Sequence, residues 1–232
     1  MRIKNLVAIF TVAITLVTVG CGDKSPIEYA AQGSNTGDSA TENLSVETES
    51  DKDFTPGVIK ENTYENAFFN VKISIPDDMR FFDNDELAEI NDVASAYASN
   101  ETVKEAMEIS RSSIVAYAAK DDGTTFNVSL SSAGKMTTAV FNERAVVEGS
   151  KQMTINEFEG IGYSDIDAEV ETTNFLGEEH YALVLKGNNP SGDYHVKAIA
   201  LLKDGYIATF TVGSPSEEGL EILDNAVKIS QS

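Results

Sequence analysis

Apolar and polar side chains alternate along several segments of the chain, and this pattern predicts β-strands. From Ala67 to Ile75 the alternation has the period of a strand with one buried face, and Pro76 ends the segment. Two shorter runs, Ser113–Ala119 and Phe126–Leu130, flank a turn rich in aspartate and glycine and predict a hairpin.

The last third of the chain predicts three consecutive strands, Tyr181–Lys186, Tyr194–Leu202 and Tyr206–Val212. Asp204-Gly205 is the expected turn between the last two of them. Residues 199–202 are apolar on both faces. This predicts that the middle strand lies in the centre of a sheet and is covered on both sides.

Apolar residues at helical spacing predict helices after an N-cap at residues 83–85, over residues 142–159, and after a capping box at Ser214–Glu217. A further helical segment is expected from Asn100 towards Ile109. The residues expected to face inward on the three helices are Leu87, Ile90, Ala94 and Tyr97; Ala145, Val146, Gly149, Met153 and Phe158; and Leu220, Leu223, Ala226 and Val227.

Together these elements predict a single α+β domain over residues 64–232. Its expected architecture is a mainly antiparallel sheet of about six to seven strands with helices packed on it. The length of this region is ordinary for one domain with one hydrophobic core.

The first twenty residues have the order of a secretory signal peptide. Arg2 and Lys4 precede an apolar run from Leu6 to Val19, which is shorter than the ~20 residues that a membrane-spanning helix needs. The run ends at Gly20-Cys21, which resembles the lipobox of bacterial lipoproteins. We therefore expect residues 1–20 to be removed and Cys21, the only cysteine, to be lipidated.

Residues 21–63 have the composition of a disordered tether. Serine, threonine, glycine and acidic residues dominate, and apolar residues are too few to offset the entropy of ordering the chain. A lipid-anchored protein with such a tether is expected outside the cytoplasm on the outer face of the cell membrane, and the tether length favours a Gram-positive surface.

The net charge of −21 limits the classes of partner. So acidic a surface repels nucleic acid and anionic lipid headgroups, which excludes nucleic-acid binding and leaves the lipid anchor as the only expected membrane contact. The charge serves solubility or, alternatively, a basic or multivalent-cation partner.

The segment from Tyr64-Glu65-Asn66 to the strand ending in Ile75-Pro76 resembles the opening of PsbP-like domains. The resemblance implies an antiparallel sheet with a C-terminal helix and an accessory, binding or assembly role without a common catalytic site. Such domains often carry tryptophan shortly after the proline, where this chain has Met79 and Phe81 instead.

The two histidines, His180 and His195, are the first candidates for a site because both fall on expected strands. If those strands form a hairpin, the two rings would lie within several residues of register and, with Glu178, would offer zinc ligands. The alternative is that both are ordinary strand histidines, because no recognised ligand spacing is present.

Four acidic residues repeat with the period of a strand and form the second candidate site. The carboxylates of Asp165, Asp167, Glu169 and Glu171 are expected on one face of a strand, pointing to solvent. We call them the acidic ladder. They offer weak metal ligands or contacts for a basic partner, although the spacing does not match a calcium-binding loop. The alternative is a solvated strand face that discourages aggregation.

Motifs for nucleophilic catalysis and for phosphate binding are absent from the sequence. We therefore expect a non-catalytic binding or accessory module of the cell envelope, with an unidentified envelope protein or ligand as its partner and with no cofactor. The alternative is an envelope hydrolase or a metal-dependent enzyme that uses His180, His195 and nearby carboxylates.

Overall fold

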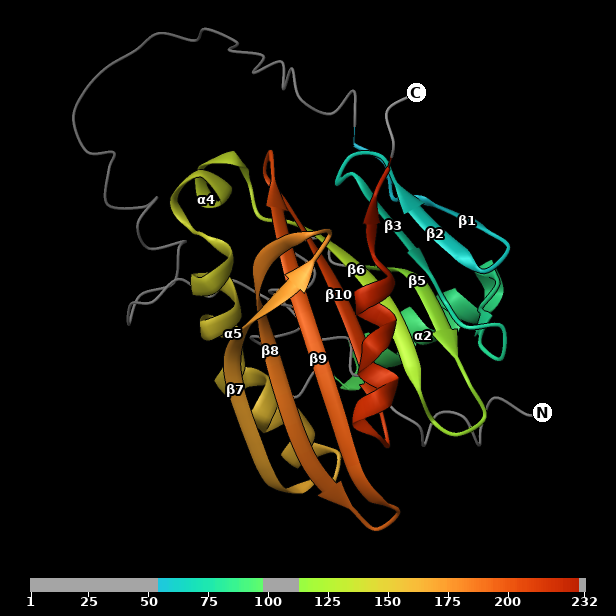
Figure 1. The fold of residues 1–232 in the computed structure, drawn as a ribbon. Coiled ribbons are helices and arrows are strands. Elements are labelled where there is room, and N and C mark those ends of the chain that lie inside the picture. Colours follow the sequence, from blue (N-terminus) through green and yellow to red (C-terminus); the bar gives the residue numbers. More distant parts are fainter. Residues whose placement is uncertain (1–53, 98–112, 230–232) are drawn as a thin grey trace, which may run out of the picture.

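Two antiparallel sheets share one core in the residues that the computed structural model describes, 54–97 and 113–229 (Figure 1). In spatial order the larger sheet contains β4 (Arg80–Phe81), β5 (Ser113–Ala119), β6 (Thr125–Ser132), β10 (Tyr206–Ser214), β9 (Gly192–Lys203), β8 (Glu178–Asn189) and β7 (Ser164–Phe175). The smaller sheet contains β1 (Val58–Lys60), β2 (Thr63–Asn66), β3 (Val71–Ser74) and β11 (Val227–Lys228). The α+β class with a mainly antiparallel sheet is confirmed.

Helices cover both faces of the larger sheet. They are the α-helices α2 (Asn84–Tyr97), α4 (Lys135–Val140) and α5 (Glu143–Gly160) and the 3₁₀-helix η2 (Glu217–Asn225). In Figure 1, η2 lies across the front of β9 and β10, while α2 and α5 lie behind the sheet. No helix among the described residues is long and apolar enough to cross a membrane.

The strands expected from alternation are present, and most are longer than expected. The hairpin of β5 and β6 and the run β8, β9, β10 pair in antiparallel register. Asp204 and Gly205 both have positive φ, 46° and 93°, as a tight hairpin turn requires. The first expected strand begins only at Val71, because residues 67–70 form a turn in which Asn70 has a φ of 58°.

The central position of β9 is confirmed. It pairs with β8 on one side and β10 on the other. Ile199 and Leu201 face the core shared with the smaller sheet, whereas Ala198 and Ala200 face a second core under α5. An apolar run without alternation is therefore explained by burial on both faces.

The structured part of the chain already includes Phe54, so the boundary expected at residue 64 is too late. The Phe54 ring stacks on Tyr206 with the ring centroids 3.9 Å apart. The hydroxyl of Tyr64 donates a 2.9 Å hydrogen bond to the carbonyl of Pro56, and β1 pairs with β2. The tether expected over residues 21–63 therefore does not include its last ten residues.

The helix beginning near Asp83 is confirmed by its cap. The Asp83 carboxylate accepts hydrogen bonds from the backbone N–H groups of Asp85 and Glu86, and the Glu86 carboxylate accepts one from the N–H of Asp83. This reciprocal arrangement is a capping box. The expected inward side chains Ala94 and Tyr97, and the helical segment from Asn100 to Ile109, lie outside the residues whose side chains are described.

The inward face of α5 differs from the expected one. Asn142 caps the helix by accepting from the N–H of Ala145, and Val146 and Phe158 are buried as expected. Gly149 is exposed, however, and its neighbours Val147 and Ser150 are buried instead. The buried face is rotated because Ser150 and Thr154 bond to helix carbonyls and so tolerate burial.

The capping box expected at Ser214–Glu217 is not formed. Ser214 is the last residue of β10, and its hydroxyl accepts a hydrogen bond from the N–H of Ser216. The following helix is 3₁₀ and buries Ile222 and Leu223. Val227, expected to face inward, is 52% exposed on β11.

Candidate binding site

The two histidines are not brought together. His195 on β9 is paired with Lys186 on β8, which lies six residues along the strand from His180. At about 3.3 Å per residue the two positions are roughly 20 Å apart along the sheet. The zinc site that needs both histidines is therefore not formed.

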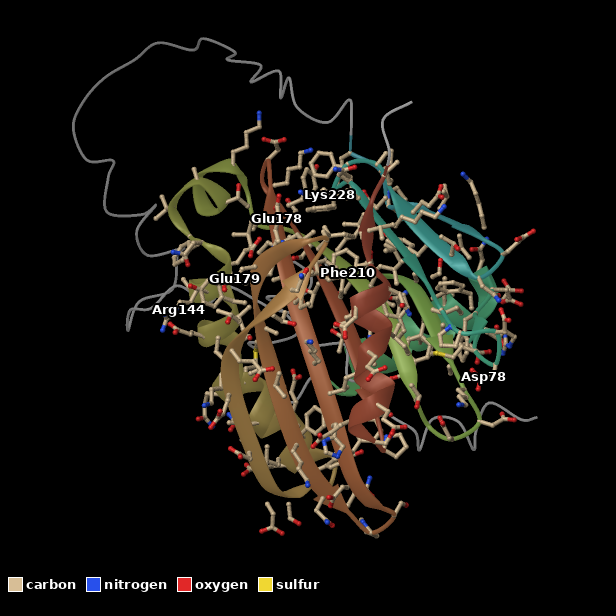
Figure 2. The ribbon with its side chains drawn as sticks, in the orientation of Figure 1. Asp78, Arg144, Glu178, Glu179, Phe210 and Lys228 are labelled. Atoms are coloured by element: carbon tan, nitrogen blue, oxygen red, sulfur yellow. The ribbon has the colours of Figure 1, made fainter. Side chains whose placement is uncertain are left out.

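His180 is held by a carboxylate from another element. Its Nδ1 lies 2.8 Å from Oε2 of Glu143, the first residue of α5, and its ring packs edge-on to Phe175. Glu178 is paired instead with Lys228 (Figure 2), so it does not point to the histidine as a shared metal ligand would. The histidine joins the N-terminus of α5 to the sheet.

His195 lies beside η2. Its Nδ1 is 3.8 Å from Oε1 of the exposed Glu217, and Lys197, two residues along β9, has Nζ 3.9 Å from Oδ1 of Asp224. These contacts connect the front face of β9 to the helix that covers it. At 3.8–3.9 Å and with exposed carboxylates, these contacts contribute little to stability.

All four residues of the acidic ladder are exposed, as expected from alternation on β7. The regular alternation covers Asp167, Glu169 and Glu171, because the strand bulges between Ser164 and Asp167 and Asp165 has a φ of 51°. Among the described residues no group of three or more His, Cys, Asp and Glu side chains is placed to hold a metal ion.

A surface cleft lies at the other end of the domain. It has a volume of about 450 Å³ and is built from three segments far apart in the sequence: the connection between β3 and β4, the turn between β5 and β6, and η2. Its charged lining residues are Asp78, Lys120, Asp122, Glu218 and Glu221. Figure 2 shows Asp78 at this end, far from the Glu178–Lys228 pair.

Lys120 is already engaged on one side of the cleft. Its Nζ lies 2.7 Å from Oδ2 of Asp78 and 3.3 Å from Oδ2 of Asp122, and these hydrogen bonds raise its pKa. Partial burial alone would raise the pKa of Asp122, but hydrogen bonds from Thr124 and the contact with Lys120 leave it below its ordinary value. These shifts keep the positive charge on Lys120 and the negative charge on Asp122.

The opposite side of the cleft carries carboxylates without a cation. Glu218 and Glu221 on η2 are exposed, and neither has an ion-pair partner among the described residues. The lining also includes the buried apolar side chains of Met79 and Ile222, which we call the apolar floor. The cleft thus combines an apolar floor with excess negative charge.

The position of η2 against the end of β10 is fixed by close packing. A Cβ atom on Gly219 would lie only 2.1 Å from Oγ of Ser214, so only glycine fits there. Oγ of Ser214 also lies 3.1 Å from Oγ1 of Thr124 on the β5–β6 side. These contacts hold two of the three segments of the cleft together.

The cleft is not predictable from the sequence, because its charged residues follow no motif and come together only in the folded domain. The one local signal near the cleft is the expected capping box at Ser214–Glu217, which predicts a helix start and no binding site. Comparisons with known proteins do not assign the chain to a family: no family model and no curated protein matches it. Its function has to be argued from its own residues.

Proposed function

We propose that the domain is a non-catalytic binding module and that the cleft between the β5–β6 turn and η2 receives a cationic group of its partner. The observation that supports this is that Glu218 and Glu221 line a cleft with an apolar floor and have no ion-pair partner in the described part of the chain. A lysine or arginine side chain offers both a charge for these carboxylates and an aliphatic stem for Met79 and Ile222.

The charges in the cleft favour a cation over an anion. Lys120 is the one basic residue in its lining, and Asp78 and Asp122 already neutralise it. An anion would be repelled by the carboxylates of η2. A cation would be attracted to them, and positive and negative charges would then alternate across the cleft. The separation of His180 and His195 gives no comparable support to the alternative of a hydrolase or metal enzyme.

A lysine-bearing peptide tests the cleft. An acetylated peptide alternating lysine and alanine should bind at low salt by calorimetry, and a matched glutamate peptide should not. Exchanging Glu218→Gln and Glu221→Gln together should weaken binding by about threefold to tenfold, as expected for two exposed ion pairs.

The matched control exchanges Glu169→Gln and Glu171→Gln on β7, which removes the same charge at residues that do not line the cleft. Equal weakening by both pairs of exchanges would mean that the peptide responds to overall acidity, and the cleft proposal would then be abandoned. Equal binding of the lysine and glutamate peptides would contradict it as well.

We also propose that the domain is delivered outside the cytoplasm as a lipoprotein anchored at Cys21. The support is the apolar run that ends at Gly20-Cys21. The PsbP-like resemblance of residues 64–76 is retained as part of this proposal and fits an accessory role in an envelope complex.

Exchange of Cys21→Ser tests the anchor without touching the cleft. Fatty acid labelling should disappear, and the protein should be released from membranes or remain as an uncleaved precursor. A variant that is labelled and fractionates like the wild type would show that Cys21 is not the lipidation site.

A further inference from the structure

The ammonium group of Lys120 lies between two carboxylates of the cleft. Its Nζ is 2.7 Å from Oδ2 of Asp78 and 3.3 Å from Oδ2 of Asp122. The structure therefore shows directly that this pair of carboxylates holds one cation. The other acidic pair in the lining, Glu218 and Glu221, has no ion-pair partner in the part of the chain that the structure describes.

Backbone contacts fix the positions of the two aspartates. The N–H of Lys120 donates a 2.9 Å hydrogen bond to the carbonyl of Thr124, which closes the turn between β5 and β6. Within this turn the Asp122 carboxylate accepts a 2.8 Å hydrogen bond from the N–H of Thr124. Pairing of β4 with the end of β5 brings Asp78 alongside Lys120. None of these backbone contacts involves the lysine side chain, so the carboxylate pair does not depend on it.

Glu218 and Glu221 form a second pair with the same chemistry. They are three residues apart on the 3₁₀-helix η2, and side chains at this spacing lie one above the other on the same side of such a helix. Both residues are exposed and line the cleft together with the aspartates. The cleft therefore has two pairs of carboxylates on different segments, and one pair holds a cation that belongs to the chain itself.

Lys120 has an advantage over a cation from solution, although its contacts are exposed. The side chains of Lys120, Asp78 and Asp122 are 36%, 58% and 45% exposed, and ion pairs of this kind are weak. The lysine is attached to the chain, however, so it competes for the aspartates at a high effective concentration. Lys120 therefore keeps its position, and an incoming cation binds at the open pair of carboxylates on η2.

We propose that Lys120 fills one of two cation positions in the cleft and thereby limits the cleft to one cationic group of its partner. The inference rests on the proposed function, because it assumes that cations bind at Glu218 and Glu221. A partner with two linked cationic groups gains nothing from its second group while Lys120 is present. Without the lysine side chain both pairs of carboxylates are open, and a linked dication occupies them together.

Simple amines test the role of Lys120. Butylamine and hexylamine carry one charge, whereas diaminobutane, diaminohexane and diaminooctane carry two charges at different separations. Each is titrated into the protein at constant low ionic strength and followed by NMR. The backbone N–H signals of Glu218 and Glu221 report on one pair of carboxylates, and the N–H signal of Thr124, which is hydrogen-bonded to Asp122, reports on the other. The quantity compared between variants is the ratio of diamine affinity to monoamine affinity.

Exchange of Lys120→Met should raise this ratio by at least about tenfold for at least one diamine, and that diamine should then shift the Thr124 signal as well. Lys120→Gln, a second uncharged variant, should give the same result. Adding Asp78→Asn to Lys120→Met should remove most of the gain. The charge-matched control is Lys186→Met, which takes a lysine from an ion pair outside the cleft and should leave the ratio at its wild-type value.

The outcomes separate this inference from the proposed function. If amines shift Glu218 and Glu221 but the ratio is the same in Lys120→Met and Lys186→Met, the cleft binds cations and the role of Lys120 is overturned. The same conclusion follows if amines shift Thr124 as strongly as Glu218 in the wild type, because Lys120 would then not keep its position. If no amine shifts any of these signals in the wild type, the proposed function fails, and this inference fails with it.

Discussion

In the folded domain the carboxyl group of Glu157 on α5 is stabilised in its neutral, protonated form. Burial raises its pKa to about 7, and no ion pair of Glu157 offsets this among the described residues. A folded-state pKa above the unfolded value means that protonation stabilises the fold. This contribution is complete below about pH 4.3, the ordinary value for glutamate, and is lost as the pH rises towards 7.

Exchange of Glu157→Gln should therefore stabilise the protein above neutral pH and have little effect at acid pH. The expected gain at pH 8 is about 1–2 kcal/mol, less than the full 1.4 kcal/mol per pKa unit because the side chain is only partly buried. Denaturant unfolding of both proteins across this range measures it. Glu159→Gln, an exposed neighbour on α5, is the control; a gain for Glu157→Gln that is the same at every pH would contradict the explanation.

Single residues also show where the alternation of apolar and polar side chains gives a wrong prediction of solvent exposure. Thr125, Asn127 and Ser129 alternate with apolar residues along β6, a pattern that predicts a strand with one solvated face. The structure buries both faces. Periodicity reports which side chains share a face, but it does not report whether another part of the fold covers that face. The ladder on β7 follows the same rule: alternation places its carboxylates on one face, and in the structure that face is exposed while Ala168 on the other face is buried.

At the scale of elements, the strands and the position of the last helix were predictable, but the 3₁₀ conformation and the cap of that helix were not. Strand positions follow from local alternation and turn residues such as Asp204-Gly205, which act over a few positions. The conformation of η2 depends instead on tertiary packing against Ser214 and Thr124. The register that separates His180 from His195 likewise depends on the full length of the hairpin of β8 and β9, which extends beyond both expected strands.

The packing of η2 against the end of β10 can be tested directly at Gly219. Exchange of Gly219→Ala places a methyl group against Oγ of Ser214, so it should destabilise the domain by about 1–3 kcal/mol in thermal or denaturant unfolding. Gly149→Ala on α5 is the matched control, since no atom lies within 4 Å of its added Cβ, and it should be neutral or stabilising. If both exchanges were equally well tolerated, the close fit of η2 would not hold.

For the whole molecule, fold class was accessible from the sequence, whereas the start of the domain and the candidate sites were not. Residues 54–63 contain too few apolar positions to show a period, yet Phe54 completes an aromatic group with Phe68 and Tyr206. The cleft likewise depends on three segments that are distant in the sequence and meet only in the folded domain. Local patterns carry no information about such neighbours.

The long-range contacts of the core also set the order in which the chain can fold. Lys203 donates a 2.7 Å hydrogen bond to the carbonyl of Phe68, which lies 135 residues earlier in the sequence. The hydroxyls of Thr124 and Ser214, 90 residues apart in the sequence, are also hydrogen-bonded. Topologies dominated by such contacts fold slowly, since long loops must close before their contacts form. Because β6 pairs with β10 in the middle of the larger sheet, an emerging chain has no complete sheet until almost its last strand has been made. Late completion of the sheet is compatible with the export before folding that the lipoprotein proposal requires.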